Sequence, residues 1–185
     1  DVVALPRFQD YVEYERAQRA SPRHAEAEAY WKKQLAEKAE PVNFYGRTQA
    51  KRTVKVQRLS VDLGAERTQR LKKLAAGEEI SGATEHASVF NVFATALFAY
   101  LSRVHRNRRY SIGVPFQNRT RVFSDTVGLF MEVYPLQIAS DEADTFCSVM
   151  EKIRAGMSEI RAFRGVALAN SPGDGSYDVL LNYHT

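Results

Sequence analysis

The chain has 185 residues, of which 44% are hydrophobic and 26% charged, so its composition is that of an ordinary globular domain long enough to bury a core. Lysine and arginine total 26 against 22 acidic residues, and the net charge of +4 is too small to indicate a nucleic-acid-binding protein by itself. Cys147 is the only cysteine, which excludes an internal disulfide framework and favours a reducing, cytoplasmic location.

The N-terminal region has no features of a signal peptide. The stretch DVVALPRFQDYVEYER lacks the basic start and the apolar run, and no apolar stretch in the chain approaches the roughly 20 residues that cross a bilayer. We therefore expect a soluble protein that does not contact membranes. The chain opens without Met and stops directly after a strand-like run, so we interpret it as a segment of a longer polypeptide.

Two helices and a linker are predicted in the first 51 residues. The apolar period over residues 8–15 predicts a short helix. Ser21 and Pro22 are typical of an N-cap and of the first position of a helix, which extends to about Glu37. From Lys38 to Lys51 the composition changes to Pro, Asn, Gly, Arg and Gln, which is typical of a linker and predicts a domain boundary there.

The middle of the chain is expected to contain a strand and two helices. Apolar residues alternate from Val54 to Leu63, and the alternation slips by one residue near Arg58, which predicts a bulged strand. The range Ala65 to Ala76 has the pattern of an amphipathic helix, and the following EEISGATEHA that of a loop. The range Val89 to Leu101 is apolar nearly all round, which predicts a buried central helix.

The last third is expected to add three strands and one helix. The ranges Tyr110 to Phe116 and Val127 to Ile138 are predicted strands, and Pro135 places a kink or a sheet edge in the second. Asp144 is expected to cap a helix whose apolar residues follow the helical period. The stretch RGVALANSPGDGS has a strong turn signal, and Tyr177 to Tyr183 is the last predicted strand.

From Val54 onwards, the predicted order of elements is β-α-α-β-β-α-β. This order does not consist of simple βαβ units. This order favours an α+β sandwich in which helices are layered on one mixed β-sheet. The chain has no internal repeat and no low-complexity tract.

The residues themselves show no self-contained catalytic or metal-binding constellation. No histidine has metal-ligand spacing to another histidine, to cysteine or to clustered carboxylates, so we predict no metal site. Cys147 has no identifiable histidine partner, and we interpret it as structural. The basic stretch RVHRNRR (103–109) complements the dipole at the end of the central helix, so we predict no nucleic-acid partner. The glycines of GDG (173–175) form a turn rather than a nucleotide-binding loop.

Four stretches, in this order, resemble motifs of the condensation domains of nonribosomal peptide synthetases, members of the chloramphenicol-acetyltransferase-like superfamily. YWKKQL (30–35) resembles the family's YWxxQL helix, and SVFNVFATALFAYLSRVHRNRRYSIGVPFQNRT (88–120) resembles its long buried helix followed by a strand ending in VGxPxxNR. DTVGLFMEVYPLQI (125–138) resembles IGxFVNTxPLR, and YDVLLNYHT (177–185) resembles the late strand ending in FNYQN. The resemblance covers essentially the whole chain, and its specificity lies in the ordered set with suitable spacing.

The resemblance implies two chloramphenicol-acetyltransferase-like subdomains that form a V, with the active site in a tunnel between them. Residues 1–50 would be the end of the N-terminal subdomain with the crossover helices, and residues 51–185 an incomplete C-terminal condensation subdomain. The family's HHxxxDG motif, whose second histidine is associated with catalysis, belongs upstream of Asp1, and no HH pair occurs in this sequence. No catalytic residue is therefore expected in this chain, which alone should be inactive.

The resemblance also implies roles for five residues. Arg119 matches the arginine of VGxPxxNR, which is thought to pair with the aspartate of HHxxxDG, so Arg119 and Asn118 are expected to clamp the missing motif. Glu132, which replaces the family's asparagine in FVNT, is a candidate for the substrate tunnel, as are Asn182 and His184 on the late strand. The family's late QDxPFE motif has no counterpart here, which indicates a divergent subtype.

The implied function is the joining of two carrier-bound acyl or aminoacyl thioesters by amide or ester bond formation. Positioning of the two thioesters supplies much of the rate, with general-base assistance from the missing histidine. The expected partners are peptidyl or acyl carrier protein domains and the adjoining N-terminal condensation subdomain; no cofactor is expected to bind directly, because the phosphopantetheine arms of the carriers are substrates. The alternatives are an acyltransferase that uses coenzyme A or one carrier, a non-catalytic carrier-docking domain, and an epimerisation domain of the same fold.

Overall fold

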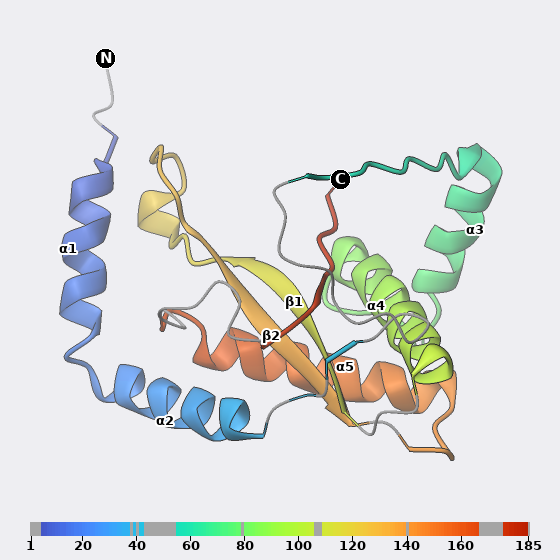
Figure 1. Cartoon of the computed structure of the whole chain (residues 1–185). Coiled ribbons are helices and arrows are strands. Elements are labelled where there is room, and N and C mark those ends of the chain that lie inside the picture. Colours follow the sequence, from blue (N-terminus) through green and yellow to red (C-terminus); the bar gives the residue numbers. More distant parts are fainter. Residues whose placement is uncertain are drawn as a thin grey trace. The chain divides into compact units, whose positions relative to one another are not determined.

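The computed structural model of the chain describes residues 5–37, 39, 41–42, 55–78, 80–105, 109–139, 141–166 and 176–184. The elements follow in the order α1 (Phe8–Gln18), α2 (Pro22–Ala36), α3 (Gly64–Ala75), α4 (Glu85–Val104), β1 (Arg109–Gln117), the 3-10 helix η2 (Arg121–Phe123), β2 (Met131–Ala139), α5 (Phe146–Phe163) and β3 (Val179–Leu180) (Figure 1). The chain divides into two compact units. Unit 1 comprises Asp1–Ala39, Ser111–Leu136 and Met157–Asn182, and unit 2 comprises Glu40–Tyr110, Gln137–Gly156 and Tyr183–Thr185.

Side-chain caps set the starts of α2 and α4. The Ser21 hydroxyl accepts a hydrogen bond from a backbone N–H of the first turn at 3.2 Å, and Pro22 is the first residue of α2, which confirms the prediction. The Thr84 hydroxyl accepts the N–H of Ala87 at 3.1 Å. The central helix α4 therefore begins at Glu85, inside the stretch predicted as a loop.

The cap of α5 is a residue later than predicted. Thr145 Oγ1 accepts the N–H of Ser148 at 3.1 Å, and the N–H of Thr145 donates to Ser148 Oγ at 3.0 Å, which makes a reciprocal pair at the start of the helix. Asp144, the predicted cap, instead pairs with Lys152 Nζ at 2.7 Å. The prediction was wrong because the Thr145 hydroxyl caps the helix. The Asp144 carboxylate instead pairs with Lys152, which lies two helical turns further along the chain.

The described strands form one mixed sheet in the order β2-β1-β3. β1 and β3 are parallel, with Ile112 opposite Val179 and the neighbouring pair in register. The N–H of Asn118, just after β1, donates to the carbonyl of Phe130, just before β2, at 2.7 Å, so these two strands run in opposite directions. The α+β class with a mixed sheet is thereby confirmed, although the last strand is only two residues long rather than seven.

β2 lies at an edge of the described sheet, which confirms the expectation for Pro135 because an edge strand tolerates a residue without an N–H. The strand begins at Met131, whereas the sequence predicted that it begins at Val127. Val127 and Leu129 are 90% and 77% exposed. They belong to the connection between β1 and β2, whose path is set by hydrogen bonds to Arg119 rather than by strand pairing.

The strand predicted over Val54–Leu63 is not formed in residues 55–63, the part of that range that the structure describes. Val56, Leu59 and Val61 are 96%, 90% and 73% exposed. An alternating pattern produces a strand only where a neighbouring strand supplies hydrogen bonds and side-chain contacts. The observed order of elements therefore lacks the first β of the predicted β-α-α-β-β-α-β.

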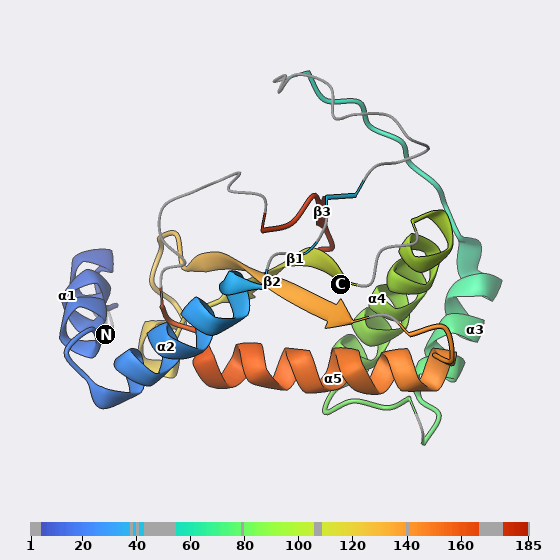
Figure 2. The same cartoon turned by 60° about the horizontal axis from the view of Figure 1, so that its bottom comes forward.

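In unit 1, α2 packs beside the C-terminal end of α5 (Figure 2). The rings of Tyr30 and Phe163 stack with centres 4.2 Å apart, and the Tyr30 hydroxyl donates to Glu159 Oε2 at 2.7 Å. The indole N–H of Trp31 donates to the carbonyl of Phe163 at 2.8 Å. The aromatic residues of the YWKKQL stretch thus form a packing seam between α2 and the end of α5.

In unit 2, α3 and α4 pack together around a small apolar core. Its members are Ala75, Val89, Val92 and Met150, with Leu71, Ile80, Phe93 and Tyr183 partly buried against them. α4 carries nine buried residues, which confirms the predicted buried central helix. These contacts explain why the helix is apolar on most of its circumference.

α4 also has the length and the composition of a membrane-spanning helix, with a mean hydropathy of 1.3, although no apolar stretch of that size was expected from the sequence. Half of this apolar stretch is buried inside the protein, as in the core helix of a globular protein.

Several predictions fall on residues that the structure leaves undescribed. They are most of the linker Lys38–Lys51, Val54, residues 106–108 of RVHRNRR, and residues 167–175 with the GDG turn.

Candidate functional site

Arg119 organises the connection between β1 and β2. Its Nη1 atom donates hydrogen bonds to the backbone carbonyls of Phe123 at 3.0 Å, Ser124 at 2.7 Å and Thr126. The guanidinium lies over the ring of Phe130, 4.1 Å from the ring centre. Within the described residues, no carboxylate forms an ion pair with Arg119. Its charge is therefore stabilised by carbonyl dipoles and an aromatic face.

α1 is held against this connection by aromatic contacts. Tyr11, Phe123 and Phe130 form a buried cluster in which the Tyr11 ring lies 5.2 Å from that of Phe123 and 4.4 Å from that of Phe130. The Thr126 hydroxyl donates to the carbonyl of Pro6 at 2.7 Å, which ties the start of α1 to the same connection. The N-terminal helix α1 thus packs on the loop that carries Arg119.

The hydroxyl of Tyr134 joins three segments that are distant in sequence. It accepts hydrogen bonds from the side-chain amide of Asn118 at 3.2 Å and from the backbone N–H of Gly165 at 2.9 Å. The ring of Trp31 stacks on the ring of Tyr134 with centres 5.3 Å apart. Burial raises the pKa of Tyr134 above its ordinary value, so the hydroxyl is neutral at physiological pH. The YWKKQL helix, the PFQNRT loop and the end of α5 therefore converge on one side chain.

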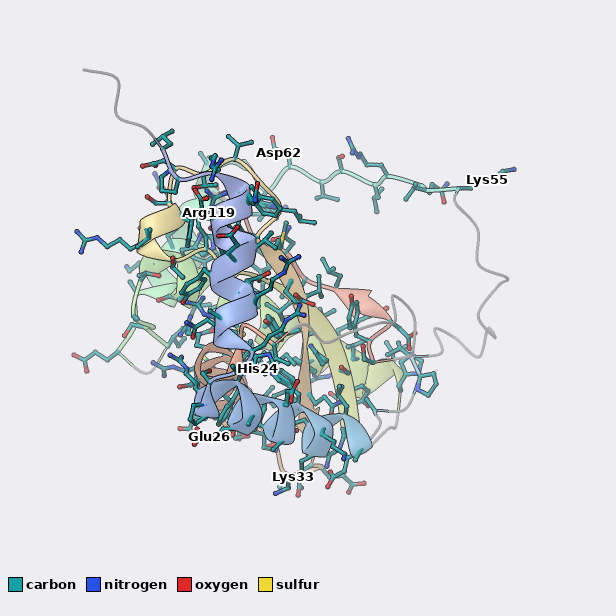
Figure 3. All side chains as sticks on the ribbon, turned by 90° about the vertical axis from the view of Figure 1, so that its left-hand side faces the viewer. His24, Glu26, Lys33, Lys55, Asp62 and Arg119 are labelled. Carbon is teal, nitrogen blue, oxygen red and sulfur yellow. The ribbon has the colours of Figure 1, made fainter. Side chains whose placement is uncertain are left out.

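A cavity of about 360 Å³ lies in unit 1, among α1, the first turns of α2, the β1–β2 connection and the residues after α5. Figure 3 faces this side of the molecule and shows Arg119 beside α1, with His24 at the start of α2. A volume of this size falls in the range of small-molecule sites. We treat this cavity as the candidate functional site.

The lining of the cavity is cationic. Its arginines are Arg23, Arg119, Arg121 and Arg164. Glu15 is the carboxylate among the lining residues, and it accepts a hydrogen bond from the Tyr11 hydroxyl at 2.8 Å. Burial and this carboxylate raise the pKa of Tyr11 well above its ordinary value, so the phenol keeps its proton.

His24 also lines the cavity and adds an imidazole ring to the lining. Its Nδ1 atom lies 3.5 Å from Oε1 of Glu28, and its side chain is only 12% exposed. The chemistry that the lining offers is therefore anion binding by guanidinium groups beside one imidazole. In the part of the chain that the structure describes, no three His, Cys, Asp or Glu residues gather as a metal site requires.

Two of the five residues with predicted roles lie together at the cavity. Asn118 and Arg119 both line it. Glu132, in β2, is partly buried, whereas Asn182 and His184 are exposed, and none of these three lines the cavity. Asn182 belongs to unit 1 and His184 to unit 2. The predicted tunnel role of these three residues stays a prediction.

Sequence reasoning missed Arg23, Arg121 and Arg164, and it did not single out Tyr134. The three arginines come from α2, from η2 and from the residue after α5, so no local spacing connects them. Tyr134 occupies the variable position of the stretch that resembles VNTxP, where the motif specifies no residue type. Only the tertiary contacts could identify these side chains.

The family model for the condensation domain matches residues 3–169 of this chain. No curated protein matches the chain in sequence. Among solved structures, crystal structures of the first condensation domain of the CDA synthetase are similar with a TM-score of 0.75 and 26% identity, over 90% of this chain and 36% of that chain. The same domain of the calcium-dependent antibiotic synthetase, in complex with substrate analogue 3a, has a TM-score of 0.76 and 24% identity over 90% and 36% of the two chains.

A variant of the starter condensation domain of rhizomide synthetase RzmA, in complex with C8-CoA, is similar in fold with a TM-score of 0.69 and 17% identity, over 95% of this chain and 40% of that chain. The chain therefore spans well under half of the length of these solved proteins. Their folds also confirm the predicted chloramphenicol-acetyltransferase-like α+β architecture. With the family model matched across 167 positions, from residue 3 to residue 169, the chain belongs to the condensation-domain family of nonribosomal peptide synthetases.

Proposed function

We propose that this chain is part of a condensation domain that joins two carrier-bound acyl or aminoacyl thioesters. An amine or hydroxyl of the acceptor attacks the thioester carbonyl of the donor, an amide or ester bond forms, and the donor phosphopantetheine leaves as a thiol with the proton of the nucleophile. The observation that carries this proposal is the condensation-domain match over residues 3–169. The convergence of three motif-like stretches on Tyr134 supports it.

In this proposal the segment supplies binding and positioning, and the proton-transfer group belongs to the HHxxxDG motif, which this sequence does not contain. Holding two thioesters in reacting geometry converts a bimolecular step into an effectively unimolecular one, which accounts for a large share of the barrier reduction. General-base assistance adds a smaller factor. This division of labour predicts that the segment alone has no transferase activity.

Arg119 and Asn118 are proposed to hold the segment that carries HHxxxDG. The loop carbonyls engage Nη1 of Arg119, while Nε and Nη2 make no hydrogen bond within the described residues. A guanidinium that is fixed along one edge can offer its other edge to a carboxylate in a bidentate pair. The contacts that fix Arg119 therefore prepare it for the aspartate of the missing motif.

The remaining assignments concern substrates and partners. Glu132, Asn182 and His184 are proposed to face the tunnel through which the phosphopantetheine arms of the two carriers enter. Peptidyl or acyl carrier protein domains are the proposed partners, together with the N-terminal condensation subdomain, and the proposed location is the cytoplasm. The phosphopantetheine arms act as substrates and not as a bound cofactor.

A second candidate function is acyl transfer from coenzyme A. The observation that favours it is the similarity in fold to a starter condensation domain whose solved structure holds C8-CoA. Both candidates use a thioester on a phosphopantetheine arm, so they differ in what carries the arm and not in the bond that breaks.

The test is a transfer assay on the intact polypeptide that contains this chain. An aminoacyl carrier would serve as the acceptor, with acyl carrier protein or acyl-CoA as alternative donors, and mass spectrometry would follow the acceptor. A gain of the acyl mass from the carrier-bound donor supports the first proposal, and a gain from acyl-CoA alone supports the second. Hydrolysis of both donors without any acylated acceptor would reject both.

A further inference from the structure

We propose that Tyr134 is a positioning residue, whose hydroxyl fixes the Asn118–Arg119 loop against the residues that follow α5. Both of these segments line the cavity of unit 1, and Tyr134 itself is not among the lining residues. The expected effect on the reaction rests on the proposed function. The inference assigns a role to a residue type that none of the resembling motifs specifies, and every residue in the argument belongs to unit 1.

The hydrogen-bonding capacity of the Tyr134 hydroxyl is used inside the protein. Tyr134 is 0% exposed. Its oxygen accepts from Nδ2 of Asn118 at 3.2 Å and from the N–H of Gly165 at 2.9 Å, which uses the acceptor capacity of the phenol. Its proton has two acceptors at 3.5 Å, the carbonyl of Val166 and Oδ1 of Asn118. The hydroxyl therefore has no position left for a substrate, and its effect on a reaction has to act through the residues that it holds.

On one side, the hydroxyl holds the loop that carries Arg119. The backbone N–H of Asn118 donates to the carbonyl of Phe130 at 2.7 Å, and the bond to Tyr134 fixes the Asn118 side chain as well. Arg119 is the next residue, and its guanidinium is bound to three carbonyls of the same connection. Because Asn118 and Arg119 are adjacent, the bond to Tyr134 also limits where Arg119 can lie.

On the other side, the hydroxyl holds the end of α5. Gly165 follows this helix with a φ of +91°, in the left-handed region that commonly ends helices. At such an end the N–H commonly bonds back to a carbonyl of the last turn, whereas the N–H of Gly165 donates to Tyr134. Arg164 also reaches the carbonyl of Gln117 at 3.2 Å, but this bond is exposed and water competes for both groups. The buried hydroxyl is therefore the stronger of these two links.

The placement of these segments matters for a reaction whose rate depends on positioning. In the proposed function, Arg119 holds the segment that carries HHxxxDG, and a misplacement of about 1 Å can lower a rate about 100-fold. Loss of the hydroxyl would release the Asn118 amide and the N–H of Gly165 together. We expect the loss to appear in kcat and not in KM, because Tyr134 touches no substrate.

The transfer assay on the intact polypeptide, at a temperature where circular dichroism shows every variant folded, tests this inference. Tyr134→Phe should lower kcat about tenfold to 100-fold and change the KM for each thioester by less than about twofold. Tyr30→Phe is the matched control, because it removes a phenol hydroxyl of unit 1 that bonds to Glu159 at 2.7 Å, at a ring outside the cavity lining. Its kcat should stay within about twofold of the wild type.

A double-mutant cycle tests whether Tyr134 acts through Asn118. Asn118→Ala should lower kcat by itself. In that background Tyr134→Phe should cost at least about threefold less in kcat than it does in the wild type, because effects of residues that act through one another are not additive. Losses in kcat that simply multiply would show that Tyr134 does not act through Asn118 and would overturn this route.

Hydrogen–deuterium exchange gives a readout that does not require activity. Tyr134→Phe should speed the exchange of the amides of residues 118–126 and of Gly165 together, by about fivefold to tenfold, because both segments lose the same buried partner. Tyr30→Phe should leave the exchange of these amides unchanged.

The outcomes separate the inference from the proposed function. If the wild type transfers acyl groups and Tyr134→Phe keeps its kcat, or Tyr30→Phe loses as much, the positioning role is overturned and the function stands. Unchanged exchange in both segments would overturn the link itself. If the wild type transfers no acyl group from either donor, the proposed function is rejected, and the exchange measurement decides whether Tyr134 holds the two segments together.

Discussion

The side-chain amide of Asn118 donates a hydrogen bond to the hydroxyl of Tyr134 at 3.2 Å, and this contact joins β2 to the loop that carries Arg119. The same hydroxyl accepts the backbone N–H of Gly165, so one buried phenol connects both sides of the candidate site. The position of Arg119 therefore depends on a residue that makes none of the proposed substrate contacts. This relationship and three others lead to measurable predictions.

Removal of the Tyr134 hydroxyl is expected to destabilise the protein. Tyr134→Phe keeps the ring that stacks on Trp31 but leaves the donors of Asn118 and Gly165 without their acceptor. Because unsatisfied partly buried donors are costly, we expect a loss of about 1–3 kcal/mol in the free energy of unfolding, measured with urea. Tyr14→Phe, at an exposed ring whose hydroxyl makes no hydrogen bond within the described residues, should change this free energy by less than about 0.5 kcal/mol. Equal urea midpoints for the two variants would contradict the role of the Tyr134 hydroxyl.

Replacement of Arg119 should loosen the β1–β2 connection. Arg119→Ala removes hydrogen bonds to three carbonyls and the stacking on Phe130, and we expect a loss of about 2–3 kcal/mol, because hydrogen bonds to charged groups contribute about 1.5–3 kcal/mol. Arg119→Lys keeps the charge but not the planar fork, so it should recover only part of the loss. Thermal unfolding measures both, with Arg121→Ala as a control that keeps the network. A melting temperature for Arg119→Ala equal to that of Arg121→Ala would show that the network does not stabilise the loop.

Gly113 should tolerate no side chain. A Cβ atom at this position of β1 would lie 2.6 Å from the ring of Tyr177, so the ring would have to move away from the β1–β3 pair. We expect Gly113→Ala to lower the free energy of unfolding by about 1–3 kcal/mol, as overpacking does. Gly82→Ala is the control, because its Cβ would meet its nearest neighbour at 3.4 Å, an ordinary contact. A second substitution, Tyr177→Leu, should reduce the damage of Gly113→Ala; the absence of any such coupling would point to a backbone effect instead.

The ion pair of Asp144 and Lys152 predicts a pH dependence of stability in unit 2. The hydrogen bond from Lys152 lowers the pKa of Asp144, so the folded protein keeps this carboxylate charged to a lower pH than the unfolded chain does. The contribution of this ion pair to the free energy of unfolding is therefore complete above the pKa of Asp144 in the unfolded chain, which is about 4. This contribution is lost as the pH falls through the lowered pKa of Asp144 in the folded protein.

For this partly exposed pair, Asp144→Asn should lower the free energy of unfolding by about 0.5–1 kcal/mol at pH 7. The difference from the wild type should shrink as the pH falls through the lowered folded pKa of Asp144, because the protonated carboxyl of the wild type and the amide of the variant are then both neutral. Urea unfolding across this pH range measures it, with Asp125→Asn at an exposed carboxylate as the control. A difference that stays constant from pH 7 to pH 2 would show that the effect is not electrostatic.

The sequence by itself determined the helices, because their signals are local. Ser21 and Pro22 mark the start of α2, and the apolar circumference of α4 and the helical period of α5 lie within single continuous stretches. The interior strand β1 was also predictable, since a short apolar run ahead of a polar loop is enough to indicate it.

Only the tertiary structure decided which strands form and what the site contains. The alternating residues 55–63 carry a strand pattern, but pairing depends on a neighbour that no local pattern specifies. Asn118 and Arg119 are adjacent in sequence and could be recognised together, whereas Arg23, Arg121 and Arg164 meet at one cavity only because α2, η2 and the end of α5 pack together. Helical periods are properties of neighbouring residues, and strand pairing and a shared cavity are properties of residues that only folding brings together.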